Sequence, residues 1–213
     1  MLKQTLIAAA IILAPVSAMA GGSIDLFFTD NNLDIDGAPS KSDGNGFGFR
    51  GQAELGKGFS MIALHQQSKI KPALFAPGSN KTSETRVGLS YAHQLNKQIT
   101  LTGSLESAQF DIELFGKKSG LGATLNGYAA NVGVKAAIID KVNGYASVGY
   151  VNLGKLQGET VSGYEYTAGL SYDVCEHWAG FVEYRTVKLN TDALSGDTDI
   201  DNDTLRVGGR YTF

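Results

Sequence analysis

Residues of alternating polarity recur along the chain in runs of about ten, and this period of two is typical of β-strands. The last run divides into two faces, with Val207, Gly209, Tyr211 and Phe213 on one side and Arg206, Gly208, Arg210 and Thr212 on the other. Aromatic residues opposite arginines do not suit a soluble sandwich, where the outer face meets water and the inner face is apolar. They suit a membrane β-barrel, whose apolar face meets lipid and whose interior is polar.

Ten such runs predict an all-β, closed antiparallel up-and-down transmembrane β-barrel. We expect strands near residues 23–30, 45–55, 59–69, 84–95, 99–114, 124–138, 143–154, 163–173, 177–188 and 204–213. An eight-stranded barrel is the alternative, and the first run and the run at 99–114 are the places where the count of ten could fail.

The connections between the strands alternate between short and long. The short ones have the glycine, asparagine and aspartate chemistry of tight hairpins, and they are Gly56-Lys57-Gly58, Asn96-Lys97, Asp140-Lys141-Val142 and Val174-Cys175-Glu176. The long ones lie near residues 31–44, 70–83, 115–123, 155–162 and 189–203. Short periplasmic turns and longer external loops are the layout of outer-membrane barrels.

Four further strands have a clear outer face. Its residues are Phe47, Phe49, Ala53 and Leu55, then Val87, Leu89 and Tyr91, then Tyr128, Ala130, Val132, Val134 and Ala136, and finally Tyr164, Tyr166, Ala168, Leu170 and Tyr172. A slip of one residue would turn the opposite face into lipid, at about 2–4 kcal/mol for each Arg or Lys at the midplane. In the third strand Met61 and Ala63 compete with Ile62 and Leu64 for the outer face, and the facing of the seventh strand is also open.

The N-terminus has the features of a secretory signal peptide. A lysine precedes an apolar stretch, and the small residues Ala18 and Ala20 define a cleavage point before Gly21. We therefore expect residues 1–20 to be removed and residues 21–213 to form a single barrel domain.

Composition agrees with a barrel. The chain has 27 glycines and only 4 prolines, and after residue 20 no apolar stretch approaches the roughly 20 residues of a spanning helix. Cys175 is the single cysteine, so an internal disulfide is impossible. The net charge of −3 argues against a nucleic-acid partner.

The terminal strand resembles the C-terminal signal of bacterial outer-membrane barrels. The residues that carry the resemblance are the polar Arg206, Gly208 two positions on, the aromatic Tyr211 and the terminal aromatic Phe213. In that family the barrel-assembly machinery recognises this strand, so the resemblance implies that these four residues form an assembly signal.

The whole mature chain resembles the small outer-membrane barrels of the OmpA, OmpX and opacity-protein type. The strand from Trp178, with Glu183 and Arg185 facing inward, is similar to the corresponding strand of that family, although most of its members have eight strands. The resemblance implies a monomer in the outer membrane of a Gram-negative bacterium, with lipid and lipopolysaccharide as partners and a role in envelope integrity or adhesion.

Ten charged residues are expected to point into the lumen: Arg50, Glu54, Arg86, Glu106, Lys135, Glu165, Glu183, Arg185, Arg206 and Arg210. Ten strands enclose little space, and buried charges are costly unless they are paired. The pattern therefore predicts a structural plug of ion pairs. A narrow pore for small solutes or ions, in which these pairs break, is the alternative.

The sequence shows no catalytic, cofactor or metal site. His65, His93 and His177 are scattered along the chain, whereas an outer-membrane enzyme, the remaining alternative, needs a gathered acid–base set.

The acidic loops invite a comparison with calcium loops. Their residues are Asp30, Asp34, Asp36 and Asp43 in the first loop, and Asp192, Asp197, Asp199, Asp201 and Asp203 in the last. The glycine that a calcium loop needs within its ligand run is missing, because Gly196 precedes the run. Solvated acidic loops are therefore expected.

The loop at residues 70–83 combines basic and apolar residues. Lys69, Lys71 and Lys81 surround Leu74, Phe75 and Pro77. This combination suits the phosphates and acyl chains of lipopolysaccharide, a protein partner, or packing on the barrel itself.

Overall fold

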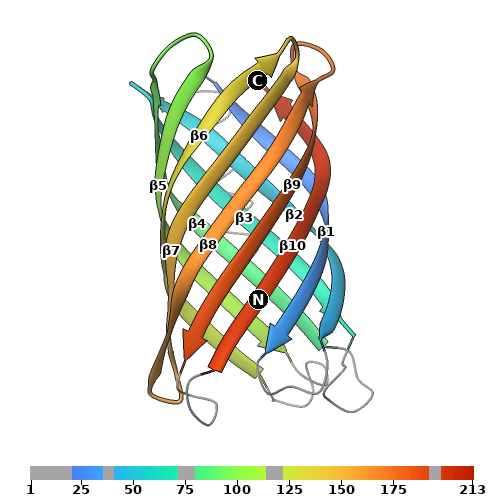
Figure 1. The fold of residues 1–213 in the computed structure, drawn as a ribbon, viewed down its shortest axis with the longest axis vertical. Helices are drawn as coiled ribbons and strands as arrows, with labels where there is room; N and C mark the ends of the chain where they lie inside the picture. Colours follow the sequence, from blue (N-terminus) through green and yellow to red (C-terminus); the bar gives the residue numbers. More distant parts are fainter. Residues whose placement is uncertain (1–20, 36–40, 72–79, 114–121, 192–197) are drawn as a thin grey trace.

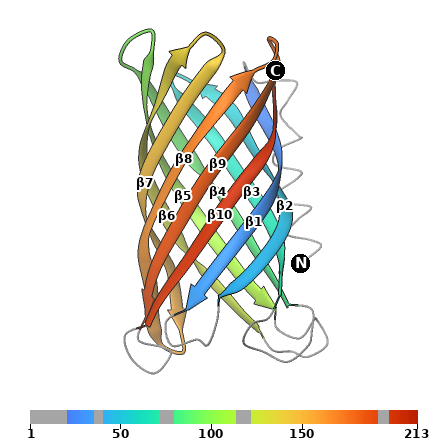
Figure 2. The ribbon, with the colours of Figure 1, turned by 45° about the vertical axis from the view of Figure 1, so that its right-hand side comes forward.

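The computed structural model describes residues 21–35, 41–71, 80–113, 122–191 and 198–213. They form ten strands: β1 (Gly22–Ile35), β2 (Ser42–Gly56), β3 (Phe59–Ile70), β4 (Asn80–Gln94), β5 (Ile99–Glu113), β6 (Gly122–Ile139), β7 (Val142–Leu156), β8 (Glu159–Asp173), β9 (Trp178–Thr191) and β10 (Thr198–Thr212). Each strand pairs antiparallel with its neighbours in the chain, and β1 pairs with β10 (Figures 1 and 2). The predicted closed barrel of ten strands is confirmed. The described residues contain no helix that is long and apolar enough to span a membrane.

The seam between the first and last strands is continuous. β1 and β10 stay in register from Ser23 opposite Thr212 to Ile35 opposite Ile200. At its end, the Gly22 amide donates to the Phe213 carbonyl at 3.3 Å, and the Phe213 amide donates to the Gly22 carbonyl at 3.1 Å. Closure satisfies the backbone groups that an open edge would leave unpaired in hydrocarbon.

The short turns lie at one end of the barrel, together with the C-terminus (Figure 1). In the first turn Gly56, Lys57 and Gly58 all have positive φ, at 93°, 53° and 83°. In the second, the side-chain oxygen of Asn96 accepts the amides of Gln98 and Ile99 at 2.8 and 2.9 Å. Short turns mark the periplasmic side of an outer-membrane barrel, so the opposite end is the extracellular end.

The prediction of a long loop at residues 155–162 is wrong. A two-residue turn joins β7 to β8, and both of its residues, Gln157 and Gly158, have positive φ as tight hairpin turns require. Gly154, also at positive φ, forms a bulge that shifts the register after Asn152. The segment is rich in polar residues and glycine, so its sequence looks like a loop although its backbone continues the ladder.

Several strands also extend further toward the extracellular end than predicted. β1 reaches Ile35 instead of residue 30, and β10 begins at Thr198 instead of residue 204. Alternating polarity disappears in these extensions because a strand outside the membrane can carry polar side chains on both faces. The remainder of the predicted long loops, at 36–40, 72–79, 114–121 and 192–197, lies outside the described residues.

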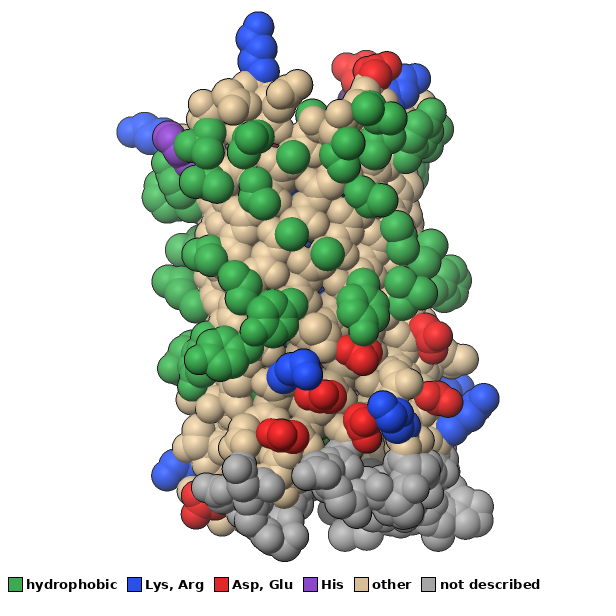
Figure 3. Space-filling model, in the orientation of Figure 1, with side chains coloured by type: hydrophobic (Ala, Val, Ile, Leu, Met, Phe, Trp, Pro, Cys, Tyr) green, Lys and Arg blue, Asp and Glu red, His purple; other side chains and the backbone are tan. Residues whose placement is uncertain are grey.

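The outer wall follows the predicted facing. Phe28 and Leu105 are 78% and 68% exposed, and hydrophobic side chains cover the middle and upper parts of the wall in Figure 3, while charged side chains gather toward the two ends. In the third strand, the register places Ile62 and Leu64 on the inner face. In the seventh, Tyr150 is on the outer face, where it contacts the ring of Tyr164.

Candidate functional site: the barrel interior

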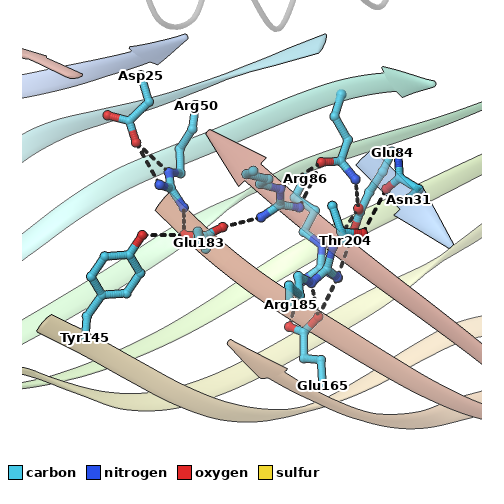
Figure 4. Close-up of polar contacts among 12 residues, drawn as sticks. Asp25, Asn31, Arg50, Glu84, Arg86, Tyr145, Glu165, Glu183, Arg185 and Thr204 are labelled. Atoms are coloured by element: carbon cyan, nitrogen blue, oxygen red, sulfur yellow. Dashed lines mark hydrogen bonds and ion pairs between the residues drawn. The ribbon is translucent and has the colours of Figure 1, made fainter. Parts of the chain in front are cut away.

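The centre of the barrel is closed by an ion-pair layer of four side chains, Glu84, Arg86, Glu165 and Arg185 (Figure 4). Arg86 of β4 binds Glu165 of β8 through two parallel hydrogen bonds of 2.8 Å and reaches Glu84 at 2.6 Å. Arg185 of β9 binds Glu84 at 2.8 Å and Glu165 at 2.5 Å. All four are buried. The contacts Arg86–Glu165 and Arg185–Glu84 cross the lumen between strands that are not neighbours in the sheet, whereas Arg86–Glu84 lies within β4 and Arg185–Glu165 joins the neighbouring strands β8 and β9.

A second set of ion pairs lies on the periplasmic side of this layer; we call Asp25, Arg50, Glu183, Arg206 and Arg210 the lower ion-pair group. Glu183 accepts hydrogen bonds from Arg206 at 2.6 Å and from Arg50 at 3.0 Å. Asp25 accepts from Arg50 at 2.8 Å and from Arg210 at 2.7 Å. Each of these two buried acids therefore serves two arginines.

Two neutral side chains complete the network. Gln66 accepts from Arg206 at 2.8 Å and donates to Glu84 at 2.9 Å, so it joins the lower ion-pair group to the ion-pair layer. The Tyr145 hydroxyl donates to Glu183 at 2.9 Å. Tyr145 reaches that acid across Gly169, where a Cβ would lie 2.4 Å from the tyrosine ring. A larger residue at that position would displace the ring.

The alternation had suggested a polar interior, but on the extracellular side the interior is not uniformly polar. Its apolar cluster consists of Ala108, Leu125, Ala129, Val151, Leu153, Val161, Val187 and Leu189. On the side of β1, β3 and β10, Asn31 donates to Thr29 and Ser68 at 2.9 and 2.6 Å and accepts from Thr204 at 2.8 Å. Among the described residues, no buried polar side-chain atom lacks a hydrogen-bond partner.

The periplasmic half contains a cavity of about 580 Å³, which we call the periplasmic cavity. Its floor includes Arg86, Glu165 and Arg206 of the ion pairs, and its wall reaches the periplasmic turns at Lys97 and His177. The interior is therefore open toward the periplasm and filled toward the extracellular end.

The structure brings seven of the ten predicted lumen charges into the two sets of ion pairs: Arg50, Arg86, Glu165, Glu183, Arg185, Arg206 and Arg210. Glu106 lies at the edge of the layer, 3.8 Å from Arg86, and accepts from Ser104 at 2.6 Å. Glu54 is exposed near the periplasmic rim, and Arg50 pairs with Asp25 and Glu183 instead. Lys135 faces the periplasmic cavity and makes no ion pair with any described residue.

Two acids of the network were missed from the sequence. Asp25 stands between the outward-facing Ile24 and Leu26, and Glu84 is two residues from Arg86 and so on the same face. The signal was present in both cases, because residues two apart in a strand share a face.

The histidines lie apart from the ion pairs and from one another. His65 faces outward and lies 2.9 Å from the Thr85 hydroxyl. His93 stacks near Tyr91, and His177 in a periplasmic turn bonds the Thr212 carbonyl at 2.9 Å. Within the described ranges, no group of three or more His, Cys, Asp or Glu residues is arranged to hold a metal ion.

Most of the expected acidic loop residues lie on strands instead of loops. Asp199, Asp201 and Asp203 are outward-facing residues of β10, and Asp201 pairs with Lys188 at 3.3 Å. Asp34 of β1 faces Asp201 in the register. Asp34 also binds Lys41 at 2.8 Å, and this contact raises the pKa of the exposed Lys41 ammonium. Asp36, Asp192 and Asp197 lie outside the described residues.

The basic residues of the 70–83 region are partly described. Lys69 of β3 stands opposite Lys81 of β4 near the extracellular end, and Lys81 stands opposite Glu113 of β5. Their apolar companions Leu74, Phe75 and Pro77 lie outside the described residues.

A closed ten-stranded barrel with a lipid-facing apolar wall and a charged interior is an outer-membrane β-barrel. The model of one family, described as the outer membrane protein beta-barrel domain, matches residues 6–213 of this chain. The chain belongs to this family, and its location is the bacterial outer membrane. No curated protein sequence matches it significantly.

Solved structures of outer-membrane proteins share the fold at low sequence identity. The translocator domain of autotransporter NalP from Neisseria meningitidis is 14% identical, with a TM-score of 0.50 over 99% of this chain and 95% of that one. Neisserial surface protein A is 11% identical, with a TM-score of 0.49 and coverages of 90% and 97%. Ail, the attachment invasion locus protein of Yersinia pestis, is 14% identical, with a TM-score of 0.46 and coverages of 92% and 99%. At these identities the similarity concerns the fold alone.

Proposed function

We propose that this protein is a non-conducting outer-membrane barrel with a structural or surface-interaction role, in envelope integrity or adhesion. The observation that carries the proposal is the filled extracellular half of the interior. Val151, Thr204 and Ala129 are each at most 1% exposed; Val151 and Ala129 belong to the apolar cluster, and Thr204 belongs to the hydrogen-bonded set around Asn31. The role requires no catalytic centre, cofactor or metal.

Lipid and lipopolysaccharide are the partners that this role implies for a monomeric barrel. Lys69 and Lys81 support the second partner, because these two lysines are register partners near the extracellular end. Ammonium groups bind phosphates as point charges. Lipopolysaccharide carries phosphates at that level of the outer leaflet.

A narrow pore for small solutes or ions is the second candidate, and the periplasmic cavity favours it. A cavity of about 580 Å³ already occupies half of a transmembrane path. Conduction would require the four side chains of the ion-pair layer to separate, which leaves buried charges without partners.

Conductance in planar lipid bilayers tests the proposal directly. We expect the purified protein to show no steady current. A variant with Glu84→Gln, Arg86→Gln, Glu165→Gln and Arg185→Gln should pass small currents, since it keeps the net charge and removes the ion pairs. The matched control, Lys188→Gln with Asp201→Asn, removes an ion pair from the outer wall and should stay silent. Large, steady conductance of the unmodified protein would overturn the proposal in favour of a pore.

The assembly signal is a further part of the proposal. Tyr211 contacts Trp178 on the outer wall, with ring centroids 5.0 Å apart and the ring planes tilted by 54°, and Phe213 bonds Gly22 through its backbone. We propose that the barrel-assembly machinery recognises the terminal strand through Arg206, Gly208, Tyr211 and Phe213 before the seam closes.

A further inference from the structure

The periplasmic cavity has two unlike walls. On one side lie the arginines of the lower ion-pair group, which project from β2 and β10. The opposite wall, from β4 to β8, carries small polar residues. These residues are Ser90, Thr100, Thr102, Ser104, Ser147, Thr167 and Ser171. Small side chains leave the space open, and their hydroxyl groups line it with hydrogen-bond donors and acceptors.

The charges around this cavity do not balance locally. On its arginine side, Arg50, Arg206 and Arg210 face the acids Asp25 and Glu183, so positive charge is in excess. The acids of the ion-pair layer, together with Glu106, offset this excess only at greater depth. Nearer the mouth, the cavity wall holds Asp173, Glu176 and Lys97.

Lys135 increases the positive charge. It lies on β6 between Thr100 of β5 and Tyr145 of β7 in the register, and its side chain is exposed within the cavity. Arg50 and Arg210 line the same cavity as Lys135. Three cations therefore converge on one space, and Lys135 forms no ion pair with the described residues.

The two arginines are also available to a ligand. The side chains of Arg50 and Arg210 are each 26% exposed, whereas that of Asp25 beneath them is 2% exposed. Arg210 binds Asp25 through Nε and Nη2, and its Nη1 makes no hydrogen bond to the described residues. Arg50 uses all three guanidinium nitrogens on Asp25 and Glu183, but these bonds do not use all of its five N–H groups. Guanidinium groups bind carboxylate and phosphate oxygens in a bidentate manner.

We propose that the periplasmic cavity is a binding site for a small solute that carries an oxyanion, either a carboxylate or a phosphate group. The anion lies between the ammonium of Lys135, the Nη1 group of Arg210 and the remaining N–H groups of Arg50, and the hydroxyl wall contacts the rest of the solute. A volume of about 580 Å³ is within the range of small-molecule sites. The solute enters from the periplasm, because the ion-pair layer closes the other end.

Isothermal titration calorimetry of the detergent-solubilised protein, purified from the outer membrane, tests this site. The probes are inorganic phosphate and succinate at low ionic strength, with chloride as the competing anion. We expect saturable binding of at least one probe, and Lys135→Gln should weaken it by roughly tenfold or more because a partly desolvated charge pair is lost. Lys135→Arg, which keeps the charge, should retain affinity. The stronger probe identifies the group as phosphate or carboxylate.

Lys155→Gln is the matched control, because it removes the same charge from an exposed position on the extracellular side of β7. It should bind the probe as the wild type does. Unchanged migration of each variant on unheated gels verifies that the barrel is folded. The site is excluded if the wild type binds neither probe, if Lys135→Gln binds as tightly as the wild type, or if Lys155→Gln loses as much affinity. These outcomes are independent of bilayer conductance.

Discussion

The two halves of the barrel interior differ in what fills them, although the same ten strands enclose both. The extracellular half is packed with branched apolar side chains and a hydrogen-bonded set around Asn31. The periplasmic half contains a cavity of about 580 Å³, and serine and threonine residues stand on the wall opposite its arginines. Side-chain size at the inward positions therefore decides whether a barrel of this width is filled or hollow.

The halves also differ in how charges are held. In the ion-pair layer every arginine contacts two acids, and the side chains are at most 8% exposed. On the cavity side Arg50 and Arg210 share Asp25 and remain partly exposed, and Lys135 has no acid partner in the described ranges. A charge without a partner is tolerated where water or a solute can reach it, and is costly where neither can.

The largest expected effect comes from breaking the ion-pair layer. Glu165→Gln should lower the free energy of unfolding by about 3–5 kcal/mol, because Arg86 and Arg185 lose a buried partner. Glu106→Gln is the matched variant at the edge of the same layer, where the nearest arginine is 3.8 Å away, and it should cost less than about 1 kcal/mol. Guanidinium-induced unfolding in detergent measures both. Equal losses of unfolding free energy in the two variants would show that the ion-pair layer contributes no more to stability than its edge does.

Two inward-facing apolar residues, one in the filled half and one in the hollow half, allow the two halves to be compared directly. Leu153→Ala should cost about 2–4 kcal/mol because it leaves a void in the apolar cluster. Ile62→Ala, on the wall of the periplasmic cavity, should cost less than about 1.5 kcal/mol since it only enlarges a space that already exists. The same unfolding measurement compares them, and a larger loss for Ile62→Ala would contradict the picture of an open periplasmic half.

The smallest effect on the finished barrel is expected at its periplasmic end. Deleting Phe213 removes one aromatic side chain and its backbone bonds to Gly22, a loss of about 1.5–3 kcal/mol or less. Refolding in detergent should proceed almost normally, whereas the amount in the outer membrane of cells should fall severely if the machinery recognises this residue. Immunoblots of fractionated membranes measure the second quantity, with Leu95→Ala, another residue of the periplasmic end, as control. Wild-type amounts after the deletion would show that the terminal strand is not an assembly signal.

Much of this architecture was predictable from local pattern. The ten strands, their short turns and the inward position of Arg206 and Arg210 follow from alternation, because lipid sets the polarity of one face of each strand. Prediction failed where that constraint ends. β7 and β8 continue past the membrane to the turn at Gln157 and Gly158, and their polar sequence there looks like a loop.

The partners in the interior were harder to predict than the residues themselves. Arg86 was correctly expected to face inward, but its bidentate acid, Glu165, comes from a strand on the far side of the lumen. Arg50 meets Glu183, which was among the expected lumen charges, and also Asp25, which was not. Contacts across a lumen depend on the stagger and tilt of the strands, and neither quantity is visible in the polarity of a single strand.

Outside the third and seventh strands, the sequence by itself determined which face of a membrane strand meets lipid, since a misplaced charge there is costly and alternation records this cost directly. Only the tertiary structure decided what the interior contains. Val151 and Leu189 are apolar residues that face inward, so polarity alone did not reveal the cluster that they form. The closure of the barrel brings side chains from distant strands together, and their summed volumes then produce a filled extracellular half beside a hollow periplasmic one.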